Sequence, residues 1–180
     1  SDMFRAGLPV SRSRIGALWD PAAETWNVSA TTLLTAERCE AEAVLDADMN
    51  LISYRMSADS ARTGAPIWNV SCTRYAGVLL FINQTADGSV NVVPARFQEQ
   101  IYPSALTSFV LSARSRGFPH QDRFTARIVY EKTLEIIPVE YSRTELRYGD
   151  RTIIQFSGEL RGMEVLEYFD QSADLLGSRT

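Results

Sequence analysis

The segment Leu51-Ile52-Ser53-Tyr54-Arg55-Met56 alternates strictly between two sets of side chains. Its even-numbered positions carry Ile52, Tyr54 and Met56, and the positions between them include a serine and an arginine. A repeat of two residues is the period of a β-strand that has one face in water. The segment therefore predicts a strand, and we expect the surrounding sequence to supply the strands that pair with it.

Short runs rich in β-branched, aromatic and aliphatic residues lie on both sides of this segment, with turn-forming residues between them. Asp87-Gly88 is a hairpin signal, because both residues tolerate the positive φ of a tight turn. Residues 1–24 show little periodicity, and we expect a loop or an edge there. The runs predicted as strands are residues 26–34, 42–46, 49–56, 67–72, 77–82 and 89–93.

The period then changes from two to that of a helix. Pro103 suits a first helical turn, and Gly117 and Pro119 supply a stop. Between them, apolar residues recur at helical spacing at Leu106, Phe109, Val110 and Ala113. The pattern predicts one amphipathic helix that begins at Pro103.

The remaining residues repeat this order on a smaller scale. Strands are predicted over residues 124–130, 133–139, 144–148 and 152–156, with a turn at Gly149-Asp150. Over residues 160–176 the apolar side chains approach an i, i+3, i+4 stripe, which predicts a second helix. Strands grouped before a helix, twice over, indicate an α+β fold. We expect two units, residues 1–118 and 119–180, each an antiparallel sheet packed on one C-terminal helix.

Composition limits the functions that this chain can have. The 180 residues are 45% hydrophobic and 22% charged, which is typical of a globular protein. Eighteen basic against 22 acidic residues give a net charge of −4, which disfavours a nucleic-acid surface. No apolar run approaches the roughly 20 residues of a membrane span, and we see no signal sequence.

Groups that could do catalysis are scarce. The single histidine, His120, lies in a polar connection, where a solvated role is the commoner one. The sequence has no GxSxG, HExxH or phosphate-loop motif, and its carboxylate pairs lie among other charges. We therefore expect no enzyme activity, no metal site and no cofactor.

Seventeen of the 18 basic residues are arginines, which suit carboxylate and phosphate groups. Arg114, Arg116 and Arg123 bracket the junction between the two predicted units, with His120 among them. This junction could receive an acidic or phosphorylated peptide, although charges near a helix C-terminus would explain Arg114 and Arg116 equally well. Trp68 is a further candidate because tryptophan is enriched at interfaces, with core packing as the alternative.

Cysteines and glycosylation motifs leave the compartment open. Cys39 and Cys72 are predicted as buried thiols, with a disulfide in an oxidising compartment as the alternative. Sequons at Asn27, Asn69 and Asn83 would suit a secreted protein. Asn69 lies in an apolar run where a buried strand would leave no room for a glycan, so we expect an intracellular protein.

Residues 126–138 and Val165-Leu166-Glu167-Tyr168-Phe169 form a pattern in the second half, and residues 77–83 before the Asp87-Gly88 hairpin echo it in the first half. In these segments the second half resembles a polo box. The resemblance implies two boxes in tandem. Lys132 falls near the histidine of the His-x-Lys pincer with which polo-like kinases grip phosphopeptides, but Leu134 stands where the pincer lysine would be.

The resemblance therefore implies a divergent box that does not capture phosphate in the usual manner. Such boxes occur in centriolar kinases and in kinetoplastid kinetochore proteins, where they dock partners or dimerise. We expect a non-catalytic targeting module, in the nucleus at a kinetochore or in the cytoplasm at a centriole, that binds a protein or peptide partner. The expected contact residues are Arg114, Arg116, His120, Arg123, Lys132 and Trp68. The alternative is a secreted or periplasmic β-rich domain that binds a small apolar ligand or a partner.

Overall fold

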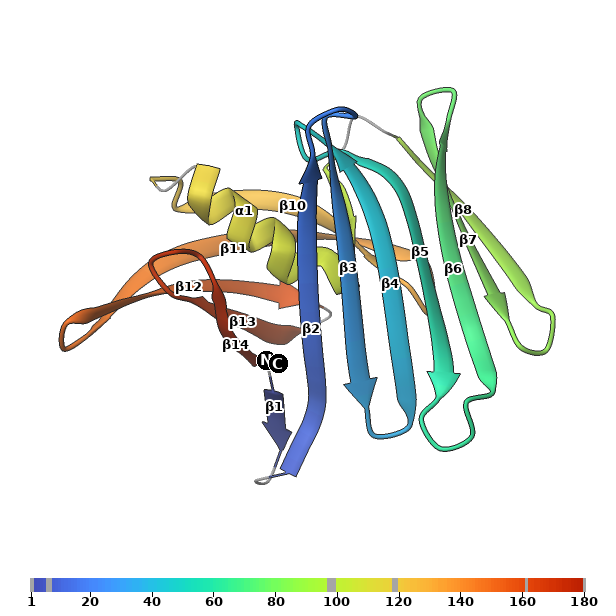
Figure 1. Ribbon diagram of the computed structural model, residues 1–180, viewed down its shortest axis with the longest axis horizontal. Coiled ribbons are helices and arrows are strands. Elements are labelled where there is room, and N and C mark those ends of the chain that lie inside the picture. The colour runs from blue at the N-terminus through green and yellow to red at the C-terminus, as the bar shows by residue number, and fades with distance from the viewer. Residues whose placement is uncertain (1, 6–7, 97–99, 118–119, 161, 180) are drawn as a thin grey trace.

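The computed structural model describes residues 2–5, 8–96, 100–117, 120–160 and 162–179. Two largely antiparallel sheets curve around a shared interior, and a single described α-helix lies between them (Figure 1). The first sheet has eight strands and the second has six. Consecutive strands are neighbours throughout both sheets, so the first sheet is a meander, and the second is one apart from a single parallel pair.

The first sheet contains strands β1 to β8 in chain order. Short turns join most of them, and the left-handed glycines Gly64 (φ 69°), Gly77 (φ 80°) and Gly88 (φ 87°) stand in three of these turns. The strands are β1 (Asp2–Arg5), β2 (Leu8–Asp20), β3 (Thr25–Leu34), β4 (Glu37–Asp46), β5 (Leu51–Ser60), β6 (Pro66–Tyr75), β7 (Val78–Thr85) and β8 (Val90–Arg96).

The second sheet has the order β14-β13-β12-β11-β10-β9. All its pairs are antiparallel except β9 with β10. That parallel pair is linked through the 3₁₀ helix η1 (Ser104–Leu106) and the helix α1 (Thr107–Gly117). The strands are β9 (Ile101–Pro103), β10 (Arg123–Tyr130), β11 (Glu135–Tyr148), β12 (Arg151–Leu160), β13 (Met163–Phe169) and β14 (Leu175–Arg179).

Helix α1 fills the space between the two sheets (Figure 1). Leu106 and Leu111 have no exposed surface, and Val110 is 3% exposed. On one side the Phe109 ring lies 6.0 Å from the Trp26 ring of β3. On the other side the Arg114 guanidinium lies over the Phe124 ring of β10, 5.7 Å from its centre. The helix therefore packs against both sheets.

One hydrophobic core includes residues from both sheets and from α1. The first sheet contributes alternate residues, as β4 shows with Cys39, Ala41, Ala43 and Leu45 buried in turn. In the second sheet the rings of Phe124 and Tyr141 stack at 5.1 Å. A side chain at Gly158 would collide with Tyr141, because an added Cβ would lie 2.9 Å from that ring. The core spans the expected boundary near residue 118, and β9 joins the sheet of the later strands.

The predicted second helix, over residues 160–176, is wrong. Residues 163–169 form β13, where Val165, Glu167 and Phe169 are buried in alternation and Met163 is 54% exposed. Gly162, at φ 74°, lies in the turn directly before β13, and the Asp170 carboxylate accepts the N–H groups of Ser172 and Asp174 in the turn after it. Because one of the buried residues is Glu167, the sequence does not show the two-residue period of β13. The other apolar residues fall by chance at helical spacing.

The predicted α+β fold of two units, each a sheet on its own C-terminal helix, is wrong for the same reason. The described chain has one α-helix, and both sheets share it. Residues 8–20, predicted as loop or edge, form the long strand β2. The helix predicted from Pro103 is present, as η1 and α1, and Pro119 lies outside the described residues. The turns at Asp87-Gly88 and Gly149-Asp150 are confirmed.

Candidate functional site

The candidate site lies where β11 extends beyond its neighbour β10. Antiparallel pairing of these strands ends at Arg123 opposite Ser142. Strand β11 continues to Tyr148, paired with β12 alone. Within this extension Arg143 shares the inner face of β11 with Val139 and Tyr141, because side chains two residues apart point the same way. Alternation therefore places a charged side chain at an otherwise apolar position.

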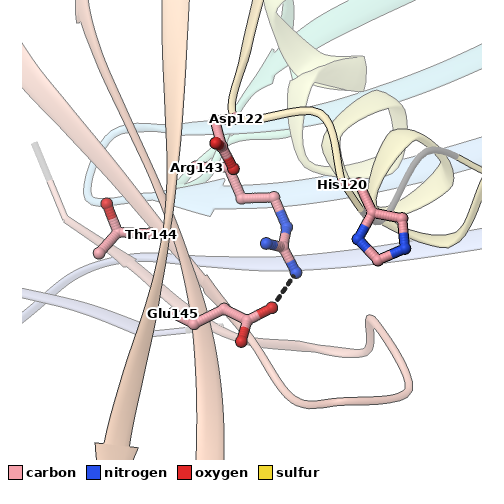
Figure 2. A pocket seen from close by; sticks show the side chains of 5 residues that line it. All are labelled: His120, Asp122, Arg143, Thr144 and Glu145. Carbon is pink, nitrogen blue, oxygen red and sulfur yellow. Dashed lines mark hydrogen bonds and ion pairs between the residues drawn. The ribbon is translucent and has the colours of Figure 1, made fainter.

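A hollow of about 510 Å³ opens beside Arg143. Figure 2 shows the Arg143 guanidinium with His120 on one side and Glu145 on the other. The hollow lies between β11 and the segment that leads into β10. Its described lining is polar throughout and consists of His120, Asp122, Arg143, Thr144 and Glu145.

The Arg143 side chain is 8% exposed, although it carries a full positive charge. Its Nη2 donates to Oε1 of Glu145 at 2.7 Å. Its Nε is buried and has no acceptor among the described residues. An unmet donor on a buried cation costs about 1–3 kcal/mol or more, so an acceptor that reached it would be bound favourably.

Glu145 is the counter-ion that Arg143 holds. The hydrogen bond and charge of Arg143 lower the pKa of Glu145 below its ordinary value, with smaller effects from Arg147 and His120. The Glu145 side chain is 54% exposed. It can therefore turn outward without loss of packing, which would leave Nη2 free for another anion.

Two carboxylates outside the hollow, those of Glu131 and Glu167, are buried, and each links separate elements of the fold. Oε1 of Glu131 accepts from the Tyr54 hydroxyl at 3.0 Å and from the Ala105 N–H at 3.0 Å, and Oε2 accepts from Ser104. Burial raises the pKa of Glu131, although these donors oppose the change. Tyr54 belongs to β5 and Glu131 follows β10, so the network joins the two sheets.

Glu167, on β13, accepts a hydrogen bond from Ser108 of α1 at 2.9 Å. Burial raises its pKa to about 7, against the opposing effect of that hydrogen bond. The contact holds α1 on the second sheet. No hollow among those described opens onto Glu167 or Glu131, so we assign both to stability.

The cysteines are buried and free, which confirms the prediction of buried thiols. Cys39 lies on β4 opposite Ala58, and Cys72 lies on β6 opposite Tyr54. Two strand spacings and a four-residue offset separate them by about 16 Å, whereas a disulfide needs Cα atoms within about 7 Å. Burial raises the pKa of Cys39 to about 11 and that of Cys72 to about 12, so neither is a reactive thiolate.

The exposure of the sequon asparagines differs from the prediction. Asn69 is exposed, so the argument that a glycan would have no room there is wrong; Asn27 is exposed as well. Asn83 is 4% exposed and donates to the carbonyl oxygens of Glu131 and Lys132. A folded chain could therefore be modified at two of the three sites.

The arginines predicted for the junction are not among the described residues that line the hollow. Arg114 packs over Phe124. Arg116 pairs with Asp174 at 2.8 Å and donates to the carbonyl oxygen of Ser172. Arg123 pairs with Glu140 at 3.4 Å. Of the predicted contact residues, His120 is the one that lines the hollow.

The other two predicted contact residues belong to different surroundings. Lys132, in the turn after β10, pairs with Glu37 of the first sheet at 2.8 Å. Trp68, on β6, is 7% exposed and belongs to the core. The sequence therefore brings neither of them to the hollow.

Arg143 was not predicted as a site residue, because the sequence predicts two short strands, residues 133–139 and 144–148, with Arg143 between them. The single strand β11 replaces these two strands, and Pro138 within it is exposed. The alternation of Val139, Tyr141 and Arg143 was the available signal. The part of the chain that the structure describes contains no group of three side chains suited to a metal ion. Among these residues no helix has the length and apolar character needed to cross a membrane.

The sequence matches no family model and no curated protein. Among solved structures, the fold is similar to that of a beta-barrel-like protein of the domain of unknown function DUF1849 from Brucella abortus. The identity is 9%, the match covers 93% of this chain and 80% of that one, and the TM-score is 0.52. A DUF1089 family protein from Pseudomonas aeruginosa has 15% identity over 92% of this chain and 88% of that one, with a TM-score of 0.49.

The resemblance to a polo box is therefore wrong. The chain has the fold of a β-rich domain, and the strand β13 at residues 163–169 replaces the helix on which the resemblance depended. The expected roles at a kinetochore or a centriole followed from that resemblance, so they are unsupported.

Proposed function

We propose that this chain is a non-catalytic, β-rich binding domain that takes an anionic group, a carboxylate or a phosphate, at Arg143. One observation carries the proposal: a buried guanidinium with an unmet Nε donor stands beside an open hollow. Guanidinium groups present five N–H donors in a planar fork that matches both anions. The ligand would accept from Nε and Nη2 after Glu145 turns outward.

The polar lining disfavours a purely apolar ligand, and the choice of an anion rests on Arg143, because the lining also contains the carboxylates of Asp122 and Glu145. Each described residue around the hollow carries a charge, an imidazole or a hydroxyl. An apolar ligand would bury these groups without partners, which is costly. The similarity to a beta-barrel-like protein supports a β-rich domain, and the choice of ligand rests on Arg143 alone.

The chemistry of the other buried groups supports a role without catalysis. The Glu131 carboxylate is occupied by three donors, and the thiols of Cys39 and Cys72 are neutral. A catalytic acid or base needs access to a substrate. These buried groups are therefore not suited to serve as the acid, base or nucleophile of a reaction.

Titration of the ¹⁵N-labelled protein with sodium phosphate and with sodium acetate, at constant ionic strength, tests the proposal. We expect the Arg143 Nε–H signal to move saturably with at least one of them, and the comparison identifies the preferred anion. Arg143→Met should weaken binding by about 10- to 100-fold, because charged hydrogen bonds are lost. Glu145→Gln should strengthen it, because the competing carboxylate is gone.

Arg55→Met is the matched control. Arg55 is also an ion-paired strand arginine, with Glu42, but it lies on the first sheet. This control should bind as the unmodified protein does. If neither anion moves the Arg143 signal, or if Arg143→Met binds as well as the control, the proposal fails.

A further inference from the structure

The extension of β11 leaves one strand edge open. Strand β11 pairs with β10 over residues 135–142 and with β12 over residues 142–148. Beyond Arg143, no described strand pairs with β11 on the side where β10 would continue. The extended β11–β12 hairpin projects from the second sheet (Figure 1).

The direction of the main-chain groups on this edge follows from one hydrogen bond. The Arg143 N–H donates to the carbonyl oxygen of Asp122 at 2.7 Å, toward the side of β10. Main-chain groups alternate along a strand, so those of Glu145 and Arg147 point to the same side. No described residue pairs with them there. Among the described residues, Asp122 is thus the outermost one whose backbone pairs with this edge, and the edge continues past it.

We propose that this edge binds an extended acidic segment of a partner protein, which adds to the second sheet as a strand. The inference rests on the proposed function, because the partner's carboxylate would be the anion at Arg143. Main-chain pairing needs a backbone with alternating N–H and C=O groups, so the occupant is a polypeptide. Affinity would come from the edge, and selectivity from the side chains on either face.

The two faces of the extension favour a particular pattern. Arg143, Glu145 and Arg147 lie on one face, and its two arginines would attract acidic side chains once Glu145 turns outward. Leu146 and Tyr148 lie on the other, and Tyr148 is 63% exposed, so apolar side chains would pack there. A strand beside β11 would therefore alternate acidic and apolar residues.

The edge strand β8 of the first sheet is a less suitable site for an added strand. Strand β8 ends that sheet and exposes Val90 and Val92, at 59% and 52%. It also contains Pro94, which has no N–H, and proline on an edge strand is a common protection against added strands. The β11 extension has no proline between residues 143 and 148.

A blocked heptapeptide in which valine alternates with aspartate tests the inference, with the full chain as receptor. We expect saturable binding, measured by calorimetry and by shifts of the Glu145 and Arg147 amide signals. Arg147→Pro removes one open-edge N–H and leaves the β11–β12 bonds intact. It should weaken peptide binding at least about tenfold relative to Arg147→Thr, which loses the same charge but keeps the N–H.

Anion binding separates this inference from the proposed function. If Arg147→Pro still binds inorganic phosphate or acetate but loses the peptide, both stand. If the two Arg147 variants bind the peptide equally, or if N-methylation of alternate peptide bonds changes nothing, strand addition is overturned while the anion site survives. A dimer that Arg147→Pro abolishes, without peptide binding, would overturn it in favour of a second copy of this chain.

Discussion

Glu167 lies between Val165 and Phe169 on the inner face of β13, where a carboxylate is least expected. It is 6% exposed, and burial raises its pKa to about 7 from an ordinary 4.5. The folded chain therefore holds a proton that the unfolded chain has already released between these two pH values. The stability of the protein should depend on this residue in a direction opposite to that of a salt-bridged carboxylate.

Glu167→Gln tests this dependence. The unmodified protein should lose stability as the pH rises from about 5 to 7, by up to ~3 kcal/mol, because ionisation then opposes folding. The variant should lack that loss and should be the more stable of the two at pH 8. Urea unfolding at pH 5 and pH 8 measures both quantities. Glu164→Gln, an exposed change on the same strand, should keep the slope, and identical slopes for all three proteins would refute the assignment.

Charged residues on inner faces limited what the sequence could predict at this scale. Both Glu167 and Arg143 interrupt an apolar alternation, and each obscured the strand to which it belongs. The buried thiols, in contrast, follow from ordinary cysteine behaviour, and the structure confirms them. Residue propensities describe the side chains that are usual at a buried strand position, whereas functional or strained positions carry side chains that depart from this preference.

At the scale of elements, local signals succeeded where they were chemically specific. Pro103 and the spacing of Leu106 and Val110 predicted α1, and Asp87-Gly88 predicted its hairpin because the turn needs positive φ. Residues 160–176 were predicted as a helix because apolar spacing alone is ambiguous over short segments. The strands form there because their inner side chains can reach a core that only the folded chain provides.

Helix α1 should contribute strongly to stability through Leu111, which has no exposed surface. Leu111→Ala should lower the free energy of unfolding by about 2–5 kcal/mol, through lost burial and the cavity left between the sheets. Leu18→Ala is the matched control, because Leu18 on β2 is 71% exposed; it should cost less than about 0.5 kcal/mol. Denaturant unfolding followed by circular dichroism compares them, and equal losses would show that α1 is not part of the shared core.

The whole molecule depends on contacts between segments far apart in the sequence. Tyr54 and Glu131 are separated by 77 positions, yet they share a buried hydrogen bond. No periodicity in either half predicts that pairing, because it arises only when the two sheets close on each other. The architecture, and with it the location of the hollow, could therefore not be predicted from local patterns.

A double-mutant cycle measures the coupling between the sheets. Tyr54→Phe and Glu131→Gln should each destabilise the protein, and their combined effect should fall short of the sum by about 0.5–1.5 kcal/mol. The corresponding cycle with Tyr75→Phe should be additive, since Tyr75 is 73% exposed. Additivity in the first cycle would mean that the hydrogen bond does not link the sheets energetically.

The meander topology has a consequence for the order of assembly during synthesis. Nearly every strand finds its ladder partner in the segment made just before it, so hairpins can form as the chain emerges from the ribosome. β1, however, lies beside β14, which is the last strand of the second sheet (Figure 1). That contact must wait until β14 has been made, so β1 remains without this neighbour while all the strands between them are synthesised.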